Sequence, residues 1–125
     1  MAENDCLSTR LRSAVVQFYK DCFGRGPVQV RVTLGDGVAV CLLSGAMTVA
    51  ERTVLAGPDA GRARDRVKRW HREVLEANRD RLAAAVEGVL AGRVRSLHHD
   101  LSTAADECAL VLCVDAPAGQ SDTKI

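Results

Sequence analysis

The chain has 125 residues, 47% of them apolar and 26% charged, so it can form one domain with its own core but has no room for a second. Its 17 Lys and Arg nearly balance its 16 Asp and Glu, which excludes a strongly basic nucleic-acid coat or an acidic tail as the dominant feature. No apolar run approaches the ~20 residues of a membrane-spanning helix, so we expect no transmembrane segment.

The start of the chain predicts a cytoplasmic protein that opens with an amphipathic helix. Residues 1–5 are acidic and polar, without the basic and apolar parts of a secretion signal. Over residues 5–23, apolar side chains recur at intervals of three and four, which is the period of a helix with one buried face. Gly24 and Pro27 then end this helix.

A β-hairpin is expected next, and the length of its loop decides which side chains of its second strand are buried. Residues 28–34 alternate apolar and polar, and Gly35-Asp36-Gly37 turns the chain. A two-residue loop would bury the smaller residues, Ala39, Cys41 and Leu43. A three-residue loop would bury the bulkier Val38, Val40 and Leu42. We favour the bulkier set, which leaves Ala39, Cys41 and Leu43 to make the far face partly apolar.

Helical signals follow the hairpin. Thr48 and Glu51 have the spacing of a capping box, which predicts a short helix over residues 49–56. A long helix should begin near Pro58 and run to about residue 91, with a kink near Asn78 or Gly88. Its first part carries an expected apolar stripe: Ala63, Val67, Trp70, Val74 and Ala77. At ~50 Å, this helix is longer than a ~23 Å strand, so it must bend, overhang the sheet or pack on a partner.

Two strands close the fold, over residues 94–101 and 108–115. The last strand is apolar on both faces, which predicts a central place in the sheet. Residues 116–125 have no periodicity and are expected to form a flexible tail after a single domain over residues 1–115. The predicted fold is α+β: a four-stranded, mainly antiparallel sheet with helices packed on one face, in the order α-β-β-α-α-β-β.

This order of elements and three short sequence motifs resemble those of a small bacterial family. The family is named for MpsC, the third component of a proposed sodium-translocating, membrane-potential-generating system. The motifs are Phe23-Gly24-Arg25-Gly26-Pro27, Gly45-Ala46-Met47-Thr48-Val49-Ala50-Glu51 and Asp100-Leu101-Ser102-Thr103. Ala46-Met47 departs from the family pattern G-x-L-T-x-x-E, so the entry to the short helix is expected to pack differently. The resemblance implies a cytoplasmic accessory protein linked to membrane transport of cations or inorganic carbon, and it supplies no catalytic residue.

Metal and thiol chemistry are not favoured, and no cofactor is expected. His98, His99 and Asp100 could approach Cys108 and Cys113, but strand alternation sends neighbouring ligands to opposite faces. The five cysteines, Cys6, Cys22, Cys41, Cys108 and Cys113, form no CxxC pair and are expected to be reduced and structural.

Anion and partner contacts are the remaining candidates. Arg25, between two glycines, could present its guanidinium to an anion, and Asp100 marks a second possible ligand site. Basic residues also cluster at the start of the long helix: Arg62, Arg64, Arg66, Lys68, Arg69 and Arg72. Asp65 with Arg69 and Arg72 with Glu76 have ion-pair spacing.

We take Arg62, Arg66 and Arg69 as contacts for an acidic protein partner. Nucleic acid is less favoured because the aromatic residues that would stack on bases fall mostly on predicted core stripes. The sequence thus predicts a non-enzymatic accessory or regulatory protein, homodimeric and peripheral to the membrane through a protein partner. The alternatives are a nucleic-acid-binding module that uses the basic helix face and a small-molecule or anion-binding enzyme built near Arg25 or Asp100.

Overall fold

The computed structural model describes the backbone of residues 2–115 and side chains from residue 5 onward, so the expected tail over residues 116–125 lies outside the described residues. Four helices and four strands follow one another as α1 (Ala2–Phe23), β1 (Gln29–Leu34), β2 (Val38–Ser44), α2 (Val49–Leu55), α3 (Ala60–Ala77), α4 (Arg79–Leu90), β3 (Arg93–Ser102) and β4 (Glu107–Asp115). The predicted α+β class and element order are confirmed.

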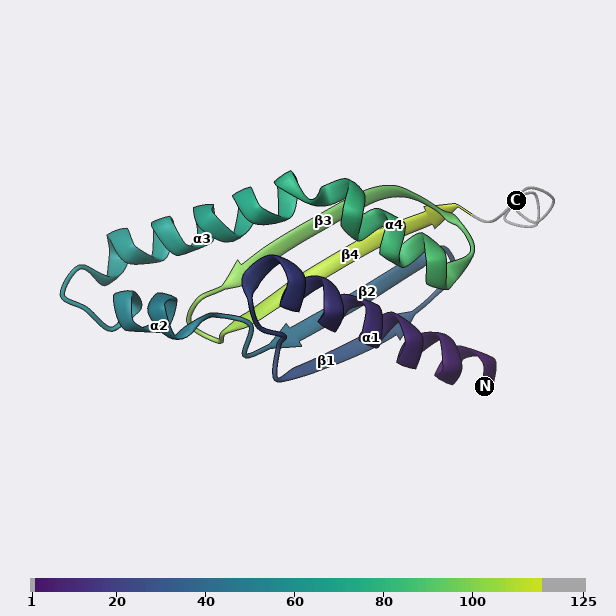
Figure 1. Ribbon diagram of the computed structural model, residues 1–125, viewed down its shortest axis with the longest axis horizontal. Helices are drawn as coiled ribbons and strands as arrows, with labels where there is room; N and C mark the ends of the chain where they lie inside the picture. Colours follow the sequence, from purple (N-terminus) through teal and green to yellow (C-terminus); the bar gives the residue numbers. More distant parts are fainter. Residues whose placement is uncertain (1, 116–125) are drawn as a thin grey trace.

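The strands form one sheet in the order β1-β2-β4-β3, and every neighbouring pair is antiparallel. The central position predicted for the last strand is therefore confirmed, because β4 lies between β2 and β3. Helices α1 and α4 lie along the sheet on one side, whereas α2 and the start of α3 project beyond its end (Figure 1).

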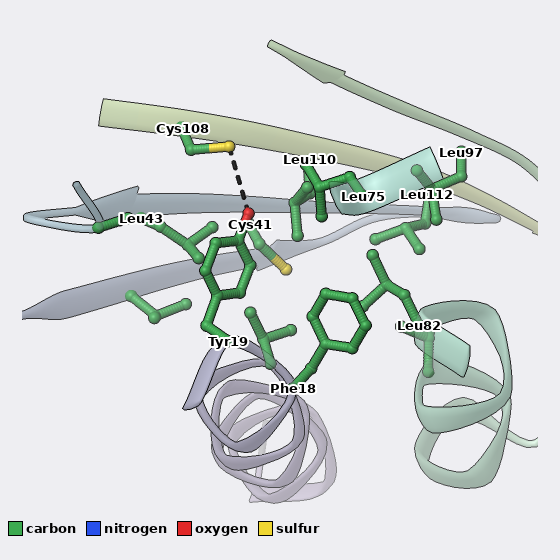
Figure 2. Packing of buried hydrophobic residues seen from close by; sticks show 14 of the residues in the cluster. Phe18, Tyr19, Cys41, Leu43, Leu75, Leu82, Leu97, Cys108, Leu110 and Leu112 are labelled. Atoms are coloured by element: carbon green, nitrogen blue, oxygen red, sulfur yellow. Dashed lines mark hydrogen bonds between the residues drawn. The ribbon is translucent and has the colours of Figure 1, made fainter. Parts of the chain in front are cut away.

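The predicted hairpin register is wrong. Gly35 N–H donates to Val38 O at 2.8 Å, so the loop holds only Asp36 and Gly37, and Gly37 takes a φ of 76°. The face shared with Val30 therefore carries Ala39, Cys41 and Leu43, each 0% exposed beneath the helices. The prediction chose the larger side chains for the buried face. The smaller Ala39 and Cys41 are buried instead because they leave space for the aromatic side chains of α1, among them Tyr19 beside Cys41 (Figure 2).

The long helix is broken at Asn78, one of the two predicted kink positions. Asn78 leaves the helical region with φ −115° and ψ 21°, and its side-chain Nδ2 donates to Val74 O at 2.9 Å. The predicted apolar stripe is only partly right. Residues at strict four-residue intervals are buried along α3, Ala63, Val67, His71 and Leu75, while Trp70 is 53% exposed and Ala77 is exposed. A buried histidine thus occupies the position that apolarity alone had assigned to tryptophan.

The core lies between the helices and this face of the sheet. Phe18 and Tyr19 reach down from α1, Leu75 and Leu82 come from α3 and α4, and leucines of β3 and β4 complete the layer (Figure 2). Tyr19 Oη lies 3.4 Å from Cys108 Sγ, which joins α1 to β4 by a buried hydrogen bond. Burial raises the pKa of the Cys41 thiol to about 11 and also raises that of Cys108, as expected for structural rather than reactive thiols.

Candidate functional site

A buried Glu51–His71 pair joins α2 to α3. The predicted capping box is present: Thr48 N–H donates to Glu51 Oε1 at 2.8 Å and Glu51 N–H donates to Thr48 Oγ1 at 3.2 Å. The same carboxylate meets His71 Nε2, at 3.1 Å from Oε1 and 2.9 Å from Oε2. The Phe23 ring stacks on His71 with centroids 4.7 Å apart, so the end of α1 closes the pair from another side.

The electrostatics of this pair favour a charged Glu51. Burial alone raises the pKa of Glu51, but hydrogen bonds from His71 and Thr48 and the attraction of His71 outweigh it and hold the pKa below its ordinary value. Sequence reasoning missed His71. Its spacing of four from both Val67 and Leu75 was the available signal, together with a carboxylate fixed at a helix start.

His71 also lines a small pocket between α3 and the sheet. Its Nδ1 is buried and makes no hydrogen bond within the described part of the chain. The other lining residues are Lys68, Arg72, Leu75, His99, Asp100, Leu101 and Cys108. The pocket volume is about 40 Å³, enough for a few water molecules or one small ion. A pocket of this volume is too small for a metabolite.

The rim of this pocket is held by ion pairs. His99 Nε2 lies 2.8 Å from Glu76 Oε2, and Arg79 donates to the same carboxylate at 2.9 Å. The hydrogen bond from His99, followed by the charge and hydrogen bond of Arg79, lowers the pKa of Glu76. Asp100 lies 3.4 Å from Lys68 Nζ at the edge of the sheet. Neither expected ion pair, Asp65 with Arg69 or Arg72 with Glu76, forms among residues 5–115.

The metal ligands considered in the sequence are separated as strand alternation requires. His99 faces α3 whereas its neighbour His98 is exposed, and Cys108 is buried under the helices whereas Cys113 lies on the other face. Within the described residues, no group of three or more His, Cys, Asp or Glu could hold a metal ion.

The basic candidates come together on the outer side of α3. Arg62, Arg66 and Arg69 are all exposed, opposite the buried stripe, and Arg62 pairs only loosely with Asp59 at 3.5 Å. Trp70 lies beside them in the sequence, exposed and not in the core as predicted. We name Arg62, Arg66, Arg69 and Trp70 the outer face of α3; the start of this helix projects beyond the end of the sheet (Figure 1).

The other two candidates lie elsewhere. Arg25 is half-buried in the connection between α1 and β1, next to Gly24 with a φ of 86°, and Asp100 is on the edge strand β3. No helix within the described range has the length and apolarity to cross a membrane.

These features define a small α+β protein with an antiparallel sheet covered by helices on one side and a projecting basic helix. The chain belongs to the family described as Na+-translocating membrane potential-generating system (MpsC), whose sequence profile matches residues 3–116. It is 28% identical over 111 residues to the uncharacterized protein YbcI of Bacillus subtilis (strain 168), with 87% of each chain covered. No solved structure matches the chain. The resemblance to the MpsC family inferred from the three sequence motifs is confirmed.

Proposed function

We propose that this chain is a cytoplasmic, non-enzymatic accessory or regulatory protein of a membrane transport system for cations or inorganic carbon. The family description, which names a sodium-translocating system, supports the link to transport. Attachment to the membrane would then go through a protein partner.

The outer face of α3 is the observation that carries this proposal. Arginine and tryptophan are the residue types that most often dominate the binding energy of protein interfaces. Here three arginines and a tryptophan of one helix are exposed to solvent. A partner with an acidic surface fits this face, because opposite charges steer encounter and select the correct partner.

Affinity capture tests the proposal with membranes from the organism that encodes the chain. The bait is the wild type or the variant R62E/R66E/R69E, and captured proteins are identified by mass spectrometry. A charge-matched control, R10E/K20E/R93E, changes three exposed basic residues on other parts of the fold. We expect the wild type and the control to retain a transport-system component and the α3 variant to lose it. Capture of no transport component by the wild type, or equal capture by all three baits, contradicts the proposal.

Nucleic-acid binding is the second candidate, and the exposure of Trp70 favours it more than the sequence did. An indole beside Arg66 and Arg69 could stack on a base while the arginines contact phosphates. Titration of the wild type with single-stranded and duplex nucleic acid at two salt concentrations separates the candidates. Tight binding that weakens steeply with salt, and that is lost in both Trp70→Ala and the α3 variant, would replace the accessory role.

A further inference from the structure

Within residues 2–115, all helices lie on one side of the sheet, and its other face has no helix over it (Figure 1). On β2 and β4, the residues that alternate with the core residues form its centre: Val38, Val40, Leu42, Ala109, Val111 and Cys113. All six are apolar, and none reaches the burial of its neighbours beneath the helices; Val38 is 38% exposed. A contiguous apolar centre on an open sheet face is the signature of an interaction surface.

Polar side chains border this centre on both edge strands, and the two borders carry opposite charge. The strand register places Arg31, Leu42, Ala109 and Asp100 in one row across the four strands. Thr33, Val40, Val111 and His98 form the next row. The β1 border therefore presents a guanidinium, 64% exposed, and the β3 border presents a carboxylate, 76% exposed.

A second copy of this chain complements such a face. If a twofold axis runs parallel to the strands between β2 and β4, each β1 lies over the β3 of the other copy. Each row of residues across the sheet then lies over the same row of the other copy. Arg31 then faces the partner's Asp100, and Leu42 faces the partner's Ala109, so that a large side chain meets a small one. An axis across the strands would instead put β1 against β1 and leave the two charged borders on opposite sides.

We propose that the chain forms a homodimer through this open sheet face, with the axis parallel to the strands. The ion pairs that Arg31 and Asp100 make within the chain are weak enough to be replaced by pairs across the dimer. Arg31 Nη2 is 3.8 Å from Glu107, and Asp100 meets Lys68 at 3.4 Å, both on exposed side chains where ion pairs are weak. This interface is separate from the outer face of α3, so it can fail while the proposed accessory role holds.

A charge-swap cycle on the full chain tests both the interface and its axis. Sedimentation equilibrium of the wild type should give twice the 13.4 kDa chain mass at micromolar concentration. Arg31→Asp and Asp100→Arg should each weaken dimerisation by about tenfold or more, because each creates two like-charge contacts per dimer. The double variant R31D/D100R should regain most of the wild-type affinity. The control Arg10→Asp, on the exposed side of α1, should change nothing.

A further variant, Leu42→Asp, places a charge at the centre of the open face and should give a monomer with the wild-type circular dichroism spectrum. If this variant unfolds, the charge-swap cycle still tests the proposal. A wild type that is monomeric throughout, or that forms larger assemblies, overturns the proposal. So does a dimer that none of the charge changes affects, or one that the double variant fails to restore. A monomeric chain whose open face is covered by a different protein would equally overturn it.

Discussion

The two faces of strand β2 differ completely although their residues alternate along seven positions. Ala39, Cys41 and Leu43 are fully buried against α1 and the core, while Val38, Val40 and Leu42 lie on the uncovered side. By size alone the second set is the better core. The comparison shows that the side chains packed against a strand decide which of its faces is buried. Here these are the aromatic side chains of α1, and the hydrophobicity of the strand alone does not decide.

The largest effect should come from making the same change on the two faces. Leu43→Ala removes a side chain that is 0% exposed and should lower the free energy of unfolding by about 3 kcal/mol, because a cavity remains in a packed core. Leu42→Ala, one residue away on the open face, should cost about 1 kcal/mol at concentrations where the chain is monomeric. Urea unfolding measures both, and equal losses would refute the difference between the faces.

The covered side also contains the Glu51–His71 pair, whose loss should be nearly as costly. Glu51→Ala removes the reciprocal cap of α2 and leaves His71 buried without its partner, which should cost about 2–3 kcal/mol. Thr53→Ala, on the exposed side of α2, is the control and should cost less than about 1 kcal/mol. Similar denaturation midpoints for the two variants would show that the pair does not hold α2 in place.

The pH dependence of stability should report the same buried carboxylate. The pKa of Glu51 is lower in the folded chain, so its charged form stabilises the fold above the unfolded pKa of about 4.3, and this contribution is lost as the pH falls through the folded pKa. Stability measured at neutral pH and again below pH 4 should therefore fall less in Glu51→Gln than in the wild type. An unchanged difference in Glu51→Gln would show that other carboxyl groups account for the acid sensitivity.

The smallest effect, on labelling rate alone, should separate the two faces of β4. Cys108 is buried under the helices and its thiol pKa is raised by burial, whereas Cys113 lies on the open face. The experiment uses variants in which Cys108 or Cys113 is the only cysteine. Cys108 should react with a thiol reagent only as the chain unfolds. Cys113 should react in the native state, and its labelling should slow at chain concentrations that favour the dimer. Native labelling of Cys108 as fast as that of Cys113 would contradict the assigned register.

Periodicity in the sequence was enough to predict the fold class, the element order and a break of the long helix at one of two positions, Asn78 or Gly88, since these depend on local spacing and helix breakers. The capping box of Thr48 and Glu51 was equally readable. The hairpin register and the buried His71 were not, because both depend on contacts made by distant elements: Tyr19 over Cys41, and Glu51 and Phe23 around the imidazole.

The basic residues of α3 were recognised as a cluster, and Arg62, Arg66 and Arg69 were singled out as partner contacts, but the place of Lys68 and Arg72 at a pocket could not be predicted. Helix geometry sends Arg62, Arg66 and Arg69 outward and Lys68 and Arg72 toward the pocket at β3, and only the position of the sheet tells which side is which. Trp70 was misplaced for the same reason, since His71 faces the core in its place.

The projecting pair of helices has a consequence for cooperativity. α2 packs on α3 beyond the end of the sheet (Figure 1), and the segment before it is held at the base, where Met47 N–H donates to Asp106 Oδ1 at 3.1 Å. Arg52 adds an ion pair with the same Asp106 at 3.7 Å. Because residues 56–62, which join α2 to α3, are exposed except for the half-buried Gly57, we expect this end of the two helices to open locally at a lower free energy than global unfolding. The backbone amides of residues 56–62 would then exchange with solvent while the strands stay protected.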